Sequence, residues 1–173
     1  SLLVSTPKSG NSTTSSNDLV ELVNVLNPQK VHGKLMLITR FGAENVQANL
    51  PHLVEAVRQT DIPVLWATDP MHGNTEETEA GIKTRRFEHI VEELSQTYTV
   101  HKETGSRLAG VHFELTGEDV TECTGGAIEL SSEDLNKNYQ TYCDPRLNYS
   151  QSLEIAFLIA KLNVVSGGDK ISH

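Results

Sequence analysis

The sequence has few cysteines, few aromatic residues and no long apolar run. Its 173 residues include 2 cysteines, Cys123 and Cys143, and 5% aromatic residues. Two distant cysteines supply neither a CxxC zinc or redox motif nor a disulfide framework, so we expect reduced thiols. The longest apolar run, near 155–160, is far shorter than the roughly 20 residues that cross a bilayer, and no charged-then-apolar leader opens the chain. We therefore expect no membrane segment and a cytoplasmic protein, or a plastid one if the source is a plant.

Positive charge is also scarce. The 14 Lys and Arg residues are outnumbered by 23 Asp and Glu residues, which gives a formal net charge of -9 and a pI of about 5.2. Nucleic acid or an anionic membrane would be repelled unless a local basic patch reversed the field, and the sequence has no such patch. We therefore expect neither as a partner. Hydrophobic residues make up 37% of the chain, enough for one domain with a core.

Segments of helical and strand character alternate along most of the chain. Residues 1–17 are rich in Ser, Thr and Gly, and we expect them to be flexible or irregular. A domain is expected over 18–162, followed by a flexible tail over 163–173. The first helix should be capped by Ser16 or Asn17 and end at Pro28. Apolar spacing predicts helices near 17–28, 45–59, 86–100 and 150–162, and strands near 34–39, 62–67 and 110–116.

This alternation predicts an α/β fold with parallel strands and outer helices. The sheet is either an open doubly wound one or part of a (β/α)8 TIM-type barrel. At most four strand and helix units fit in the chain, whereas a complete barrel usually needs roughly 250 residues. If the barrel interpretation is right, the chain is about half of a barrel, its C-terminal part.

The residues that follow the expected strands are unusually polar. In both parallel architectures ligands bind at the carboxyl ends of the strands. His72 follows the second strand, His112 and Glu114 share one face of the third, and Asp144 lies in the segment beyond it. His72, Glu114 and Asp144 form a mixed N/O ligand set for a divalent ion. From the residues alone, capping, turn-forming and orienting roles remain the common alternative.

Two cations and a pair of glycines could bind an anion near these residues. Arg40 and Lys83 are placed to meet a phosphate or carboxylate, or to form salt bridges with the many acidic side chains. Gly125 and Gly126 could present backbone N–H groups to an anion, or be ordinary turn residues. Four further histidines are expected to be solvated rather than functional: His32, His52, His89 and His101.

Six short strings follow one another along the chain. They are LITRFGA (37–43), DPMHGNT (69–75), KTR (83–85), VHFELTG (111–117), VTECTGG (120–126) and CDPRLN (143–148). These strings resemble the successive motifs, in the same order, of type II, plant-type 3-deoxy-D-arabino-heptulosonate 7-phosphate (DAHP) synthases. The chain resembles the C-terminal part of these enzymes from about 18 to 162, and DPMHGN and CDPRLN are highly specific.

The resemblance implies a (β/α)8 barrel and a metal-dependent transferase reaction. These synthases condense phosphoenolpyruvate with erythrose 4-phosphate, the first step of the shikimate pathway to the aromatic amino acids. His72, Glu114 and Asp144 match the family's metal ligands, and Mn²⁺ or Co²⁺ is the expected cofactor. Arg40 matches an arginine that binds phosphoenolpyruvate, and Lys83 matches a lysine near the reacting groups and the aldose phosphate.

The resemblance also marks where this chain departs from the family. Lys8 could correspond to a substrate-binding lysine that ends a strand, although the residues around it are altered. The family's metal site uses a further cysteine from a much earlier region, which neither Cys123 nor Cys143 matches. Half of a barrel would expose strand edges and apolar faces, so we expect a homo-oligomer or association with a missing N-terminal half. Two alternatives stay open: a non-catalytic fragment that binds metal or anions or associates with a full-length synthase, and a different metal-dependent aldolase or lyase.

Overall fold

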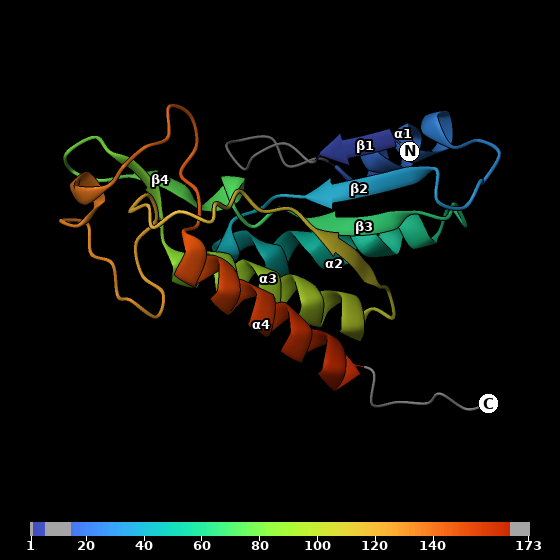
Figure 1. Ribbon diagram of the computed structural model, residues 1–173. Helices are drawn as coiled ribbons and strands as arrows, with labels where there is room; N and C mark the ends of the chain where they lie inside the picture. The colour runs from blue at the N-terminus through green and yellow to red at the C-terminus, as the bar shows by residue number, and fades with distance from the viewer. Residues whose placement is uncertain (1, 6–14, 167–173) are drawn as a thin grey trace. The chain divides into compact units, whose positions relative to one another are not determined.

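The computed structural model describes residues 2–5 and 15–166 (Figure 1). Contacts divide the chain into two compact units. Unit 1 comprises residues 1–74 and 92–113, and unit 2 comprises 75–91 and 114–173. Lys8 lies outside the described residues, as do most of the two segments expected to be flexible.

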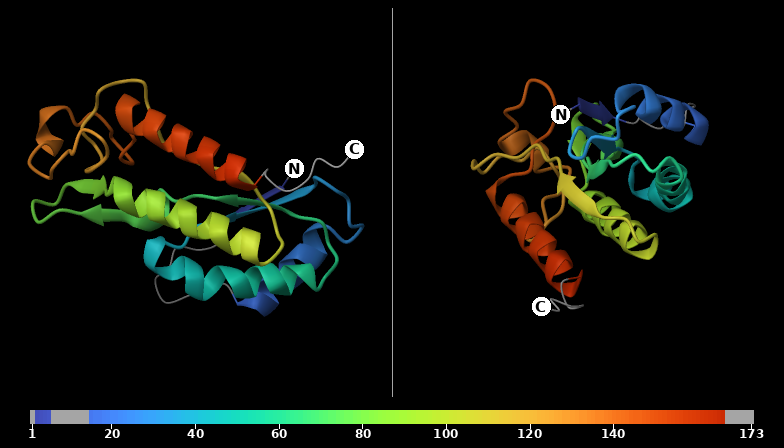
Figure 2. Two further views of the ribbon diagram at one scale, coloured as in Figure 1. Left: turned by 90° about the horizontal axis from the view of Figure 1, so that it is seen from below. Right: turned by 90° about the vertical axis from the view of Figure 1, so that its right-hand side faces the viewer.

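Unit 1 contains a four-stranded parallel sheet in the order β1-β2-β3-β6. Helices α1 and α2 pack side by side on one face of this sheet (Figure 2). Leu35 and Leu37 of β2 are buried on that face together with Leu19 of α1 and Leu50 of α2. The elements of unit 1 are β1 (Leu2–Ser5), α1 (Ser16–Leu26), β2 (Leu35–Thr39), α2 (Val46–Arg58), β3 (Leu65–Thr68) and β6 (Leu108–Val111).

Helix α1 shows how local sequence sets these elements. Its N-cap is Ser15, whose hydroxyl accepts the backbone N–H of Asp18 at 3.1 Å, so the expected caps one and two residues later were wrong. Leu19 and Val23 lie four residues apart and are both buried, which gives the helix its apolar face. The helix ends before Pro28, as expected.

Unit 2 is built around a hairpin, a helix and a long irregular segment. β4 (Thr75–Glu77) and β5 (Lys83–Arg85) pair antiparallel, a hairpin that the sequence did not predict. α4 (Tyr149–Ser166) is the expected last helix, extended beyond its predicted end at 162. Helix α3 (Phe87–Glu103) begins in unit 2 and continues into unit 1.

Two expectations about strands were wrong. Leu2–Ser5 is a strand rather than irregular chain, because its apolar residues pair in register with β2. β6 ends at Val111, so His112 and Glu114 do not share a strand face. His112 still donates its N–H to the carbonyl of Thr68 at 2.8 Å, and the chain then leaves β3. The N–H groups of Thr116 and Leu147 bond to the carbonyls of Leu147 and Glu114, both at 2.9 Å.

The fold is therefore α/β with a parallel sheet and helices, as predicted. β2 is buried at alternate positions and half-buried at Met36 and Ile38. Cys123 and Cys143 are free thiols, as expected. Among the described helices, none is long and apolar enough to cross a membrane.

Candidate metal and substrate site

The polar residues after β2 and β3 meet in unit 1. Arg40, directly after β2, bonds through Nε and Nη2 to Oδ2 of Asp69 at 3.0 and 2.9 Å. Asp69 follows β3 directly, and its backbone N–H donates to the carbonyl of Thr39 at 2.8 Å. The salt-bridge alternative for Arg40 is thus realised, while more than a quarter (28%) of its side chain stays exposed.

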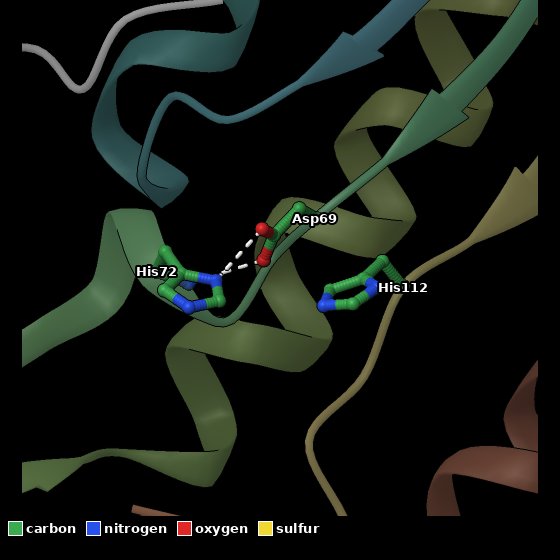
Figure 3. Close-up of side chains that lie close together, drawn as sticks. All are labelled: Asp69, His72 and His112. Carbon is green, nitrogen blue, oxygen red and sulfur yellow. Dashed lines mark hydrogen bonds and ion pairs between the residues drawn. The ribbon is translucent and has the colours of Figure 1, made fainter. Parts of the chain in front are cut away.

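Asp69 is the centre of this group, although sequence reasoning did not single it out. Its Oδ1 accepts the backbone N–H groups of Met71 and His72, each at 3.1 Å, and its Oδ2 lies 2.7 Å from Nδ1 of His72 (Figure 3). Burial raises the pKa of the Asp69 carboxyl, but the His72 N–H and the charges of His72 and Arg40 outweigh burial and lower the pKa overall. The signal was available: an aspartate at a strand end commonly accepts backbone N–H groups of the following turn.

His112 completes the group from the end of β6. Its ring stacks against that of His72 at a centroid distance of 6.1 Å and an interplanar angle of 26° (Figure 3). Ligand atoms of Asp69, His72 and His112 all lie within 4.8 Å of one another. Asp69 is buried, His72 is half-buried and His112 is exposed, so the imidazoles are open to solvent from one side.

A second buried carboxylate bonds to both of the loops that follow β2 and β3. Glu93 of α3 has no exposed surface and accepts the N–H groups of Phe41 and Gly42, both at 3.0 Å. It also accepts Nδ2 of Asn74 at 2.7 Å. Burial raises the pKa of Glu93 to about 7, against the opposing effect of these donors. Glu93 lies three residues after the apolar Ile90, so helical spacing placed it on the buried face of α3, a signal that sequence reasoning did not use.

The close approach of the two loops depends on glycine at two positions. A Cβ on Gly73 would lie within 3.0 Å of the Gly42 backbone, which no side chain could avoid. Gly42 has a φ of 83°, and its own Cβ would meet the carbonyl oxygen of Gly73 at 3.0 Å. The Gly in each of the strings LITRFGA and DPMHGNT is therefore needed for packing of the loops.

Unit 2 brings together the other predicted cation and the two predicted carboxylates. Lys83 donates to Asp144, and this bond raises the pKa of Lys83 and lowers that of Asp144. Arg85, which sequence reasoning did not select, is fully buried and donates from Nη1 to Oε2 of Glu114 at 2.5 Å. Its Nη2 lies 3.8 Å from Oδ1 of Asp144. One guanidinium therefore lies beside both carboxylates.

Glu122 accepts hydrogen bonds from the loop that carries Asp144 and holds this loop in place. This buried carboxylate accepts Nε and Nη2 of Arg146 at 3.0 and 2.6 Å and the backbone N–H groups of Thr141 and Arg146. Burial raises the pKa of Glu122, but the bonds and charge of Arg146 lower it overall. An arginine that bonds to a carboxylate through two nitrogens forms a stronger and geometrically more specific ion pair than one that bonds through a single nitrogen.

The turn role is the one realised for the glycine pair, whereas the expected exposure of His101 was wrong. The N–H groups of Gly125 and Gly126 bond to the carbonyl of Leu130 and to Glu88, so they are not presented to an anion. His101 is buried rather than solvated, and its ring lies 5.6 Å from that of Trp66 at an interplanar angle of 52°. Burial lowers its pKa to about 4. His32 and His52 are exposed, as expected.

Residues 7–160 match the Class-II DAHP synthetase family. The chain belongs to this family. It is 48% identical over 155 residues to a phospho-2-dehydro-3-deoxyheptonate aldolase of Streptomyces coelicolor. A phospho-2-dehydro-3-deoxyheptonate aldolase of Neurospora crassa is 50% identical over 149 residues, and the phospho-2-dehydro-3-deoxyheptonate aldolase AroG of Mycolicibacterium smegmatis is 48% identical over 150 residues. The alignments cover 90%, 85% and 87% of this chain but 34%, 31% and 32% of the relatives, so the chain spans about a third of their length.

In this member of the class-II DAHP synthetase family, His72, Glu114 and Asp144 offer nitrogen and oxygen atoms of the kinds that bind a divalent ion. His72 has a buried carboxylate at Nδ1, the usual partner of a metal-binding imidazole. Glu114 and Asp144 offer carboxylate oxygens, for which a bound ion would compete with Arg85 and Lys83. Unit 1 holds Arg40 and His72, and unit 2 holds Lys83, Glu114 and Asp144.

Proposed function

We propose that the chain contributes the C-terminal part of a DAHP synthase active site. This transferase condenses phosphoenolpyruvate with erythrose 4-phosphate and releases phosphate, at the entry of the shikimate pathway. The observation that carries the proposal is the 48–50% identity to relatives named phospho-2-dehydro-3-deoxyheptonate aldolase over 85–90% of the chain. The polar side chains at the ends of β2, β3 and β6 support it, because ligands of parallel α/β folds bind there.

His72, Glu114 and Asp144 are proposed as the protein's metal ligands. An imidazole with two carboxylates suits Mn²⁺ or Co²⁺, and we expect one of these ions to support the highest activity. A divalent ion held there would act as a Lewis acid on the aldehyde of erythrose 4-phosphate. The protein's own contribution is to hold the ligands still: Asp69 fixes His72, and Arg85 fixes Glu114.

Arg40 and Lys83 are proposed to bind the phosphorylated substrates. Arg40 presents a partly exposed guanidinium, held by Asp69, to the carboxylate or phosphate of phosphoenolpyruvate. Lys83, with 42% of its side chain exposed, can exchange Asp144 for the phosphate of the aldose. Lys8 is proposed as a further substrate cation. Together these cations would neutralise substrate charge and align the two reactants.

The proposed architecture is about half of a (β/α)8 barrel. β1 and β6 are the edge strands of the described sheet, and an unpaired parallel edge favours pairing with further strands. We propose that a second copy, or a polypeptide that supplies the remaining units, pairs with these edges. We also propose a cytoplasmic location, or a plastid one if the source is a plant.

The test is phosphate release from phosphoenolpyruvate by the purified chain, with and without erythrose 4-phosphate, Mn²⁺ and chelator. Release that needs both the aldose and the metal would support the proposal, and His72→Ala should abolish it. His52→Ala is the matched control, because His52 is exposed on α2 and should be dispensable. A folded chain that releases no phosphate, alone or with the remaining part of the synthase, would contradict the proposed activity.

A further inference from the structure

The carboxylate of Asp69 is held on both oxygens. Oδ1 accepts two backbone N–H groups, from Met71 and His72, and Oδ2 faces Nδ1 of His72 and the guanidinium of Arg40. Only 1% of its side chain is exposed. The carboxylate therefore cannot turn to meet another group without losing several hydrogen bonds at once, and each loss at a buried charged acceptor is costly.

These contacts decide where the proton of His72 lies. An ionised carboxylate only accepts hydrogen bonds, so a nitrogen 2.7 Å from it must carry hydrogen. Nε and Nη2 of Arg40 also donate to Oδ2 of Asp69, so this oxygen is an acceptor and carries no hydrogen toward His72. In a neutral imidazole the proton on Nδ1 leaves the lone pair on Nε2, which lies on the side of the ring away from Asp69 (Figure 3).

We propose that Asp69 is a positioning residue that fixes His72 as its Nδ1–H tautomer and directs Nε2 to serve as the metal donor. The inference rests on the proposed function only in taking His72 as a metal ligand. Asp69 itself is not a ligand, because both of its oxygens are occupied by neighbouring donors. Arg40 and His72 share Oδ2, so the same carboxylate also orders the proposed substrate cation.

The first test needs no variant. Ring 15N chemical shifts of the metal-free, labelled chain report the tautomer of each neutral histidine, and the His72→Ala spectrum assigns the His72 signals. We expect the Nδ1–H form with an unprotonated Nε2. A neutral His72 with its proton on Nε2 would overturn the proposal, whatever the chain does with substrates.

The second test replaces the acceptor. In Asp69→Asn the side-chain oxygen can still accept the backbone N–H groups, which places an amide donor against Nδ1 and reverses the tautomer. Mn²⁺ affinity, measured by calorimetric titration, should fall about 10–100-fold, the usual effect of losing such a partner. Asp61→Asn is the control: Asp61 is exposed in the same unit, and its positive φ of 54° suits asparagine.

Failure of this inference and failure of the proposed function give different results. If Asp69→Asn folds, shows an unchanged circular dichroism spectrum and binds Mn²⁺ as the unmodified chain does, Asp69 does not position His72. If the unmodified chain binds no Mn²⁺, the proposed metal function fails, while the tautomer measurement still decides what Asp69 does to His72. Loss of Mn²⁺ affinity together with the reversed tautomer supports both.

Discussion

The buried guanidinium of Arg85 donates to the carboxylate of Glu114 across 2.5 Å, while its Nη2 lies 3.8 Å from Asp144. Within the described chain, Nη2 has no hydrogen-bond partner. Nε and Nη1 also bond to the Thr75 hydroxyl and the Pro145 carbonyl. A fully buried cation next to two carboxylates holds both acidic groups in place. Removing it would leave negative charge in a poorly solvated position.

Arg85→Met should therefore destabilise unit 2. We expect a loss of about 3 kcal/mol, the low end for breaking a buried pair, because a quarter of the Glu114 side chain is exposed. Urea unfolding can be followed by the exposure of buried Cys123 to a thiol reagent, after exposed Cys143 has reacted. Arg86→Met is the control: Arg86 is exposed, pairs with Glu76 at 2.8 Å and should contribute less than about 1 kcal/mol. Equal losses in the two variants would contradict the assigned role.

Lys83→Met should strengthen metal binding in the absence of substrates. Lys83 occupies Asp144, so a divalent ion has to compete with its ammonium group. A half-exposed pair is worth up to about 1 kcal/mol, so we expect Mn²⁺ affinity to rise up to about fivefold in a calorimetric titration. Lys137→Met makes the same charge change at an exposed lysine paired with Asp134. If it raises affinity equally, the effect is general electrostatics rather than competition at Asp144.

The sequence predicts the helices of this structure better than it predicts the residues of the candidate site. Apolar residues at helical spacing, such as Leu19 and Val23, locate the helices because burial of one face is what forms them. The six strings located Arg40 and His72. Asp69 and Arg85 were not selected, because their importance lies in contacts between segments distant along the chain, and no periodicity reports such contacts.

The same limit explains the errors at the ends of elements. The end of β6 was misplaced because residues 114–116 pair with Leu147, more than thirty positions away. His101 was expected in solvent because a histidine near a helix end is usually exposed, yet packing near Trp66 buries it. In both cases tertiary contacts overrode a reasonable local prediction.

Gly73→Ala should disturb the loops that carry Arg40 and His72. Its Cβ would collide with the Gly42 backbone, which cannot turn aside as a flexible side chain would. We expect a loss of about 1–3 kcal/mol, the usual effect of overpacking, seen as a lower midpoint in urea followed by the single tryptophan, Trp66. Gly117→Ala is the control, since nothing lies within 4 Å of its Cβ position. No difference between the two variants would show that the loops can separate at little energetic cost.

His101 should make unit 1 less stable in mild acid. Burial lowers its pKa to about 4 from an ordinary 6.5, so below pH 6.5 the unfolded chain binds a proton that the folded chain does not. The free energy of unfolding should then fall with the pH from 6.5 to 4, by about 2 kcal/mol at pH 5. His101→Phe should remove this contribution, and His52→Phe at an exposed position should not. Urea unfolding at pH 7 and pH 5, followed by Trp66, compares the three chains.

Glu93 should act in the opposite direction. Its pKa is raised from 4.5 to about 7, so between these values the folded chain holds a proton that the unfolded chain has lost. Its contribution to the free energy of unfolding should fall as the pH rises from 4.5 to 7, by up to about 3 kcal/mol, and stay constant above. Glu93→Gln should remove this dependence, so that relative to the unmodified chain it is more favourable at pH 8 than at pH 5.

The control for Glu93 is its neighbour on α3. Glu92 is exposed, and Glu92→Gln should leave the pH dependence of unfolding unchanged. If Glu93→Gln also leaves it unchanged, the carboxylate is ionised throughout, and the N–H groups of Phe41 and Gly42 with the amide of Asn74 compensate its burial. If the dependence disappears, protonation near neutral pH removes an acceptor from these donors. Below pH 7 the folded chain would then hold Glu93 protonated, in keeping with the larger free energy of unfolding expected there.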